Sequence, residues 1–190
     1  MKKLELVYNE IFYSLFKENK EKFTQLELAK KLRISLSTVN NALKPLRRIN
    51  AIRVSLRSFI LVNKRKILLY WASIRNLEKD IIYKTRVENI IDAEKNMPPH
   101  VIFTAYSGYK FNFKNTPADY SELYVYSNDL EEIKRRFPEK KGPENLFILK
   151  FDNKLKLNPA LLFVDLWNLR EWYAKDFLKA LEGKINGILE

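Results

Sequence analysis

The sequence contains no cysteine and a single histidine, His100. The lack of cysteine excludes disulfides, zinc–thiolate sites and cysteine nucleophiles, and it suits a reducing compartment. One histidine cannot build a multi-histidine metal site or a histidine relay, and no nucleophile-elbow sequence accompanies it. We therefore expect neither a resident metal nor a cofactor.

Long apolar runs are also absent. The apolar runs, such as Phe59–Val62 and Leu161–Val164, are no longer than strands, so none can span a bilayer. The opening residues Met1–Glu5 lack the apolar core of a signal peptide. With 46% hydrophobic residues, the 190-residue chain can still bury a core. These features predict a soluble, cytoplasmic protein of one or two small domains with no membrane partner.

Acidic residues are missing from one long stretch of a chain whose formal net charge is +12. Leu28–Leu77 holds 12 Lys or Arg and no Asp or Glu. Residues 1–96 hold 21 basic and 10 acidic side chains, a net +11, whereas residues 97–190 hold 14 and 13, a net +1. A solvated surface normally mixes the two signs, so the asymmetry indicates a surface for a polyanion, most simply double-stranded DNA. A merely basic surface without a partner is the alternative.

Hydrophobic spacing in the first quarter of the chain predicts three helices. Residues 3–20 carry apolar side chains at helical intervals. Thr24, three residues before Glu27, predicts the cap of a second helix. Ser35 predicts the cap of a third, whose last turn Pro45 should kink or tighten. The side chains expected to face inward from the second and third helices are Leu28, Ala29, Leu32, Leu36, Val39, Leu43 and Leu46.

A hairpin and a further helical stretch are expected next. The β-rich runs 51–55 and 58–63 are separated by too few residues for anything but a tight turn. Residues 65–94 are predicted to be mainly helical, and the pair Pro98-Pro99 ends that pattern. In the second half we expect strands at residues 101–103, 122–127, 146–151 and 161–166, a helix from Asn128 or Asp129 to Phe137, and a closing helix from Glu171 to Leu181 that Gly183 ends.

The third helix leaves a polar face that contains no acidic residue. Asn can bond adenine edges, Ser and Thr can bond phosphates or bases, and Lys and Arg can meet phosphates or guanine. A helix with such a face fits the major groove. An ordinary helical hairpin with a solvated face is the alternative, although such faces usually include Glu or Asp. The predicted DNA-binding residues of this helix are Ser37, Thr38, Asn40, Asn41, Lys44, Arg47 and Arg48.

The hairpin region adds four basic residues to the predicted interface. Arg57 lies at the tip, where it can enter a minor groove or contact phosphate. That Arg57 is only a solvated turn residue is an equally good interpretation. Arg53, Lys64 and Arg65 are expected to make nonspecific phosphate contacts.

The segment from Phe23 to about Asn63 resembles winged helix-turn-helix transcription regulators. The resemblance is clearest in Leu-Ala-Lys-Lys-Leu-Arg-Ile-Ser-Leu-Ser-Thr-Val, residues 28–39. It implies a DNA-binding domain in which the hairpin is the wing. Arg33 replaces the usual glycine of the turn, so Arg33 must adopt the backbone conformation that glycine provides.

The second half resembles a nucleotidyltransferase-like core in Tyr106-Ser107-Gly108, in Asp119 and Glu122, and in Phe163–Leu166 with Asp165. In active members of that family a Gly-Ser turn cradles a triphosphate and three carboxylates hold two metals. Here the order is Ser-Gly, and Asp119 and Glu122 lie three apart, so they do not alternate onto one strand face. We therefore expect a noncatalytic domain.

A winged helix followed by such a domain resembles the AbiEi-type antitoxins, transcription regulators of type IV toxin–antitoxin systems. The run Pro159–Leu178 is similar to that family's ending, where a strand leads into an amphipathic helix. The resemblance implies autoregulation on DNA and a role opposing a toxin, so a toxin or another protein is the second expected partner, bound through the C-terminal domain. A homodimer is compatible with the sequence.

These inferences predict an α+β protein in three parts. A winged helix-turn-helix DNA-binding domain covers residues 1–75, a helical connector 76–97, and a small α/β nucleotidyltransferase-like domain 98–190. The expected function is DNA-binding transcription regulation without catalysis. Two alternatives stay open: a nucleotidyltransferase enzyme tethered to nucleic acid, which needs three clustered carboxylates beside an open pocket, and a protein-interaction module.

Overall fold

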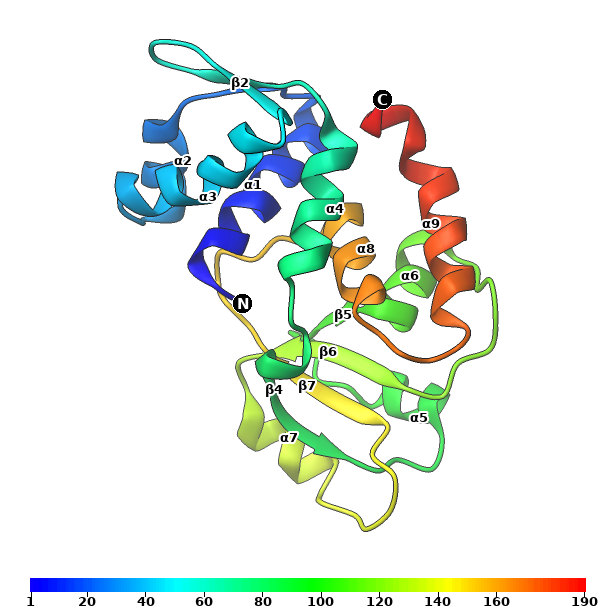
Figure 1. The fold of residues 1–190 in the computed structure, drawn as a ribbon. Coiled ribbons are helices and arrows are strands. Elements are labelled where there is room, and N and C mark those ends of the chain that lie inside the picture. Colours follow the sequence, from blue (N-terminus) through cyan, green and yellow to red (C-terminus); the bar gives the residue numbers. More distant parts are fainter.

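Two sheets organise the chain, and helices pack around both (Figure 1). The computed structural model describes residues 1–190. The smaller sheet has the strand order β1-β3-β2, and the larger has the order β4-β7-β6-β5. Within the larger sheet β6 and β7 are parallel, whereas the pairs β4–β7 and β5–β6 are antiparallel. The predicted α+β class is confirmed.

The first half of the chain forms the upper unit in Figure 1. Its elements are α1 (Lys3–Glu18), β1 (Lys22–Phe23), α2 (Gln25–Leu32), α3 (Leu36–Arg48), β2 (Ile52–Val54), β3 (Phe59–Leu61) and α4 (Lys64–Ile74). The predicted helix starts at Thr24 and Ser35 and the predicted hairpin are all confirmed. Pro45 lies inside α3, which continues to Arg48.

The second half forms the larger sheet and the helices on its two faces. Its elements are η1 (Glu78–Asp80), β4 (Ile81–Thr85), α5 (Ile90–Lys95), β5 (Ile102–Thr104), α6 (Ala105–Phe113), β6 (Leu123–Ser127), α7 (Leu130–Arg136), β7 (Leu146–Lys150), α8 (Pro159–Trp167) and α9 (Ala174–Leu189). The predicted strands near β5, β6 and β7 and the helix capped by Asp129 are confirmed. None of the helices combines the length and the apolar composition that a bilayer crossing requires.

The strand predicted over residues 161–166 is wrong, because this segment is helix α8. Asn158 starts the helix: its Oδ1 accepts hydrogen bonds from the backbone N–H of Ala160 (3.0 Å) and Leu161 (3.1 Å). Pro159 follows at the first helical position, where its missing N–H costs nothing. Residues 160–166 are all buried, so every side of the helix is covered, and apart from Asp165 they are apolar, so no helical period is visible in the sequence.

The helical prediction for residues 65–94 is wrong at its centre, and the predicted connector 76–97 is not simply helical. Helix α4 ends at Ile74, and Ile81–Thr85 forms strand β4 at the edge of the larger sheet, antiparallel to β7. Burial alternates along this strand, which is the two-residue period of a half-covered edge. The closing helix also differs from its prediction, because α9 runs through Gly183 to Leu189.

One apolar core joins the two halves. It contains residues of α1–α4 together with α6, α8, α9 and one face of the larger sheet, 42 buried side chains in a single cluster. Strand β6 divides its side chains by alternation: Tyr124 and Tyr126 face this core, and Leu123 and Val125 face a smaller cluster under α5 and α7. Helix α8 is thus enclosed between the upper unit and the sheet, and the first 75 residues do not have a core of their own.

Candidate nucleic-acid interface

The turn between α2 and α3 has the backbone that the sequence demanded. Arg33 adopts the left-handed conformation, with φ 49° and ψ 49°. The N–H of the next residue, Ile34, donates to the carbonyl of Ala29 at 3.0 Å and closes α2. Ser35 Oγ then accepts from the N–H of Thr38 at 3.0 Å and opens α3. Arg33 therefore takes the glycine position of the turn without breaking it.

Helix α3 is amphipathic, and its inner face is held against α1. Val39, Ala42, Leu43 and Leu46 are buried, and the hydroxyl of Tyr8 donates to the carbonyl of Ala42 at 2.6 Å. Leu36 was expected to face inward as well, and this is wrong: its side chain is 50% exposed at the first turn of the helix.

The residues predicted to face outward on α3 differ in their solvent exposure. Ser37, Asn41, Lys44 and Arg48 are exposed, whereas Thr38, Asn40 and Arg47 are half-buried. Thr38 Oγ1 lies 2.8 Å from Ser35 Oγ, so this hydroxyl is engaged in the helix cap. Asn41 is the more accessible of the two asparagines.

The β2–β3 hairpin lies beside the start of these helices and is anchored by aromatic packing. Phe59 of β3 stacks on Phe23 of β1 with ring centroids 5.7 Å apart, and both rings are buried. The turn closes with the N–H of Ser55 donating to the carbonyl of Ser58 at 2.7 Å. Arg53 and Arg57 are exposed on the hairpin.

The eleven predicted DNA-binding residues include cations of two kinds. Lys44, Arg47, Arg48, Arg53 and Arg57 form no ion pair. Lys64 pairs with Glu21 at 2.8 Å, and Arg65 pairs with Glu182 at 3.2 Å. These two acids come from outside the acid-free stretch of the sequence, and the fold brings them to its basic residues.

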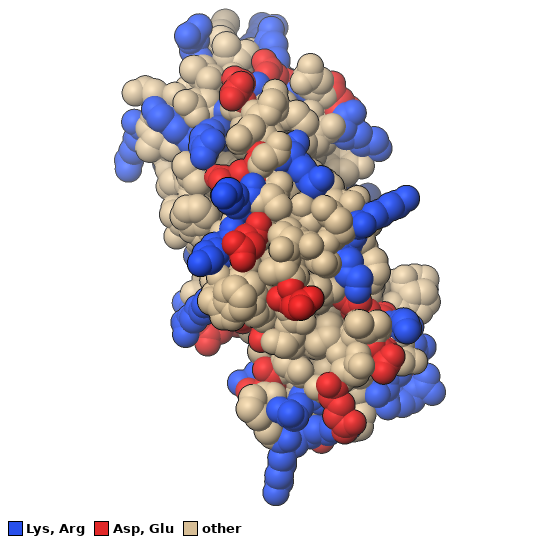
Figure 2. Space-filling view, turned by 90° about the vertical axis from the view of Figure 1, so that its right-hand side faces the viewer, with Lys and Arg blue, Asp and Glu red and all other residues tan.

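Figure 2 faces the right-hand side of Figure 1, where α9 lies, and the charge on this side is mixed. On this side Lys and Arg lie among Asp and Glu, with no large area of one sign. Helix α3 lies on the left of Figure 1, on the far side of the view in Figure 2, so the ion pairs define the candidate interface. The cations without an ion pair mark the outer face of α3 and the hairpin, a smaller surface than the sequence indicated.

A hollow that sequence reasoning missed lies between the hairpin and the first turns of α2 and α3. Its volume is about 430 Å³, and its apolar side chains are Leu26, Leu36, Val54 and Leu56. All four are more than two-fifths exposed, and Leu56 at the hairpin tip is 97% exposed. Only Leu56, in a two-residue turn, could have been marked as exposed from sequence. The remaining lining residues are Thr24, Gln25, Ser55, Arg57 and Ser58.

The carboxylates of the second half are arranged differently from a two-metal site. Asp165 is on α8 and fully buried, where its carboxylate accepts from Arg75 Nε at 3.1 Å and from Tyr126 Oη at 2.6 Å. Asp119 is exposed, and Glu122 is half-buried and accepts from the hydroxyl of Tyr173. No group of three or more His, Cys, Asp or Glu side chains is placed to hold a metal ion.

The segment Tyr106-Ser107-Gly108, which resembles the Gly-Ser turn of active nucleotidyltransferases in reversed order, lies inside helix α6. Ser107 is buried and its Oγ donates to Glu94 at 2.6 Å. A Cβ at Gly108 would lie 2.6 Å from Leu162 Cδ2 and 2.8 Å from the carbonyl oxygen of Phe103. The glycine therefore permits close packing of α6 against α8 and β5.

The chain matches no protein-family model, no curated protein and no solved structure in these comparisons.

Proposed function

We propose that the protein is a DNA-binding transcription regulator that inserts α3 into a major groove. The observation that carries this proposal is the set of five unpaired cations on α3 and the β2–β3 hairpin, in a stretch of chain without one acid. A surface of that kind attracts the phosphate backbone and gains affinity by releasing its counterions. The short turn between α2 and α3 and the exposed polar face of α3 support a helix-turn-helix mode of docking.

In this proposal the side chains divide into two groups by their reach. Asn41, and to a smaller degree Asn40, reads base edges from the exposed face of α3, because an asparagine amide can pair with adenine. Lys44, Arg48 and the hairpin arginines contact phosphates and set the register of the protein on the duplex. Lys64 and Arg65 contribute less, since each already has a carboxylate partner.

A genome-wide pull-down of bound DNA fragments tests the proposal. We expect enrichment of a limited set of sites, and enrichment of the protein's own promoter would add autoregulation. The double variant Lys44→Ala/Arg48→Ala should lose this enrichment. A matched control, Lys134→Ala/Lys141→Ala, removes two exposed lysines from the opposite end of the molecule and should retain it. Equal recovery of DNA by both variants would contradict the proposal.

The antitoxin role depends only on the resemblance to the AbiEi-type family, and the structure differs from one of the features behind that resemblance. The run Pro159–Leu178 was expected to be a strand followed by a helix, whereas it begins with helix α8. We propose for the second half a role in positioning the DNA-binding surface or in contacting another protein. A catalytic role is not proposed, because the Asp165 carboxylate forms a buried ion pair with Arg75 and is inaccessible to solvent.

The apolar hollow favours one second candidate, a protein-interaction module. Exposed leucines at the tip of a hairpin and at a helix start suit an apolar side chain of a partner protein better than a phosphate. Leu56→Ser and Lys44→Ala/Arg48→Ala together decide between the candidates. In a protein-interaction module, Leu56→Ser abolishes partner binding and Lys44→Ala/Arg48→Ala has little effect. In a DNA-binding protein, Lys44→Ala/Arg48→Ala abolishes DNA binding and Leu56→Ser has little effect.

A further inference from the structure

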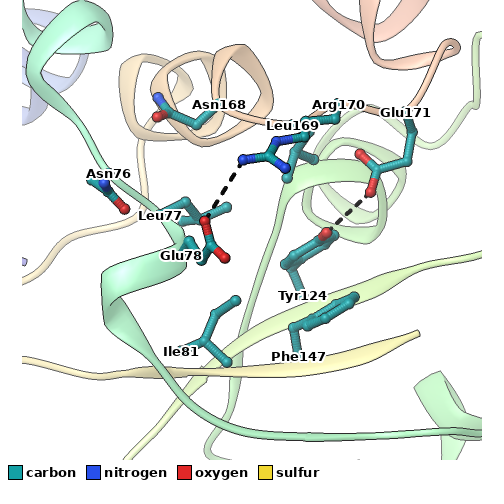
Figure 3. A pocket seen from close by; sticks show the side chains of 10 residues that line it. All are labelled: Asn76, Leu77, Glu78, Ile81, Tyr124, Phe147, Asn168, Leu169, Arg170 and Glu171. Atoms are coloured by element: carbon teal, nitrogen blue, oxygen red, sulfur yellow. Dashed lines mark hydrogen bonds and ion pairs between the residues drawn. The ribbon is translucent and has the colours of Figure 1, made fainter. Parts of the chain in front are cut away.

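A pocket of about 330 Å³ lies where the α4–β4 connection, the larger sheet and the α8–α9 loop meet (Figure 3). This volume is at the lower end of the range of about 300–1,000 Å³ that small-molecule sites occupy. The lining residues are Asn76, Leu77, Glu78, Ile81, Tyr124, Phe147, Asn168, Leu169, Arg170 and Glu171. None of them belongs to the proposed DNA-binding surface, so a ligand here does not require DNA binding.

One wall of the pocket is aromatic and aliphatic. Tyr124 and Phe147 are paired neighbours on the parallel strands β6 and β7, and their rings stack with centroids 4.7 Å apart and planes 14° apart. Leu77 and Ile81 lie across from these rings in Figure 3. This wall suits an apolar stem, and the faces of aromatic rings attract cations.

Above the two rings in Figure 3 lies a carboxylate that has no cationic partner. Glu171 accepts hydrogen bonds from the hydroxyls of Tyr124 (3.2 Å) and Tyr106 (2.9 Å), and it forms no ion pair. A carboxylate oxygen can accept two hydrogen bonds, so each oxygen of Glu171 keeps one free acceptor position. The adjacent Glu122 has no cationic partner either, and burial together with Glu171 raises its pKa.

The balance of charge at the pocket is negative, in a chain of net charge +12. Glu78 stands at the mouth with its side chain 80% exposed. The one cation of the lining is Arg170, whose Nη2 lies 3.8 Å from Glu78 Oε2 and whose side chain is 91% exposed. Arg170 therefore forms an ion pair with Glu78. It forms neither an ion pair nor a hydrogen bond with Glu171, whose side-chain hydrogen bonds come from Tyr124 and Tyr106.

We propose that this pocket binds a small organic cation, a primary ammonium or a guanidinium carried on a short apolar stem. The cationic head donates charge-assisted hydrogen bonds to Glu171, with Glu78 adding long-range attraction at the mouth. The stem lies against Phe147, Leu77 and Ile81. Anionic ligands are disfavoured by the two carboxylates, and neutral ones leave the free acceptor positions of Glu171 unpaired.

Isothermal titration calorimetry on the full chain tests this site with n-butylguanidinium and n-butylammonium as probes. We expect saturable binding of at least one cation at one site per chain, weakened by added salt. Butyrate and n-butanol, which share the stem, should bind at least about tenfold more weakly. Equal affinity for the cation and n-butanol would overturn the proposal.

Variants locate the binding within the molecule. Glu171→Gln keeps the size of the side chain and an acceptor oxygen, and it should weaken cation binding about tenfold or more by removing the charge. Glu78→Gln changes an exposed side chain, so we expect folding to be unaffected. It should weaken cation binding by a smaller factor than Glu171→Gln does. Glu88→Gln is the matched control, because Glu88 is equally exposed and lies outside the lining. If Glu171→Gln does not fold, the affinities of Glu78→Gln and Phe147→Leu for the alkyl cations test the site instead. Full cation affinity in both variants would show that the cation does not bind in this pocket.

The same chemistry can come from a free amine or from a lysine or arginine side chain of another protein. Titration with N-acetyl-lysine-amide and with a short lysine-containing peptide separates the two sources. Tighter binding of the peptide than of n-butylammonium indicates a protein partner, and the reverse order indicates a free small molecule. Failure of both, together with failure of the alkyl cations, refutes the site, whereas DNA binding is unaffected by either outcome.

Discussion

Arg75 and Asp165 form an ion pair in the interior that joins the two halves of the chain. Arg75 Nε lies 3.1 Å from Asp165 Oδ1, and the two side chains are 1% and 0% exposed. Burial by itself would lower the pKa of Arg75, but Asp165 and the neighbouring acids raise it above its usual value, so the guanidinium stays charged. Burial and Asp165 together raise the pKa of Tyr126, whose hydroxyl stays protonated and donates to the same carboxylate. The pair thereby ties the end of α4 to α8 and to the sheet.

Asp165→Asn should destabilise the protein by about 3–5 kcal/mol, because it leaves Arg75 buried with one fewer counter-charge. Denaturant unfolding followed by far-UV circular dichroism measures this loss. Glu132→Gln is the control: it removes an acid whose arginine partners, Arg135 and Arg136, are on the surface, and the unfolding free energy should hardly change. A loss as small as the control's would show that the interior pair is not needed.

Asn41→Ala should lower affinity for a specific DNA site by about 1–3 kcal/mol and leave affinity for random DNA nearly unchanged. The reason is that Asn41 is exposed on α3 and carries no charge for the backbone. Fluorescence anisotropy with a fragment recovered from the pull-down and a shuffled duplex gives both affinities. Asn40→Ala should have the smaller effect, because Asn40 is half-buried. Equal losses on both duplexes in Asn41→Ala would remove its base-reading role.

Arg57→Ala should reduce the slope of log K against log salt by about 1, the loss of one phosphate contact. Lys64→Ala should reduce the slope by clearly less, since Lys64 is already paired with Glu21 at 2.8 Å. The comparison uses two basic residues a few positions apart in the sequence and differing in their ion pairing. If the two slopes fall equally, the pair with Glu21 opens on binding and our division of the cations is wrong.

Two glycine-to-alanine variants should change stability in opposite directions. Gly183→Ala should stabilise the protein by about 0.5–1 kcal/mol, because Gly183 lies within α9 and nothing stands within 4 Å of an added Cβ. Gly108→Ala should destabilise it by roughly 1–3 kcal/mol, because the added Cβ would overlap Leu162 and the backbone of Phe103. Thermal unfolding compares the two, and a stabilising Gly108→Ala would contradict the close packing of α6.

Features with a local cause could be predicted from the residues themselves. Thr24, Ser35 and Asp129 each supply a side-chain oxygen to a backbone N–H three residues on, an interaction that is complete within one turn. The β2–β3 hairpin likewise follows from two short runs and the few residues between them. The exposed face of α3 was predictable for the same reason, since helical periodicity assigns its residues to a side.

Other predictions failed because the deciding contacts are distant in sequence. Helix α8 is buried on every side because it is enclosed between the upper unit and the sheet, and an apolar run as short as Ala160–Val164 is ambiguous between strand and buried helix. Ile81–Thr85 is a strand because β7, more than sixty residues later, offers its edge. Leu36 fits the apolar spacing of α3 but lies at its first turn, where it borders an open hollow between the start of α2 and the hairpin and stays half exposed.

For the charged residues too, the sequence determined one property and the tertiary structure another. Composition alone determined that the first half of the chain is strongly basic, because charge count needs no coordinates. Which of those cations are free was decided by the fold: it places Glu21 beside Lys64 and Glu182 beside Arg65, and leaves Lys44, Arg48 and Arg57 without partners. Caps and helix faces depend on neighbours within a few residues, whereas ion pairs and buried helices depend on which distant segments share one core.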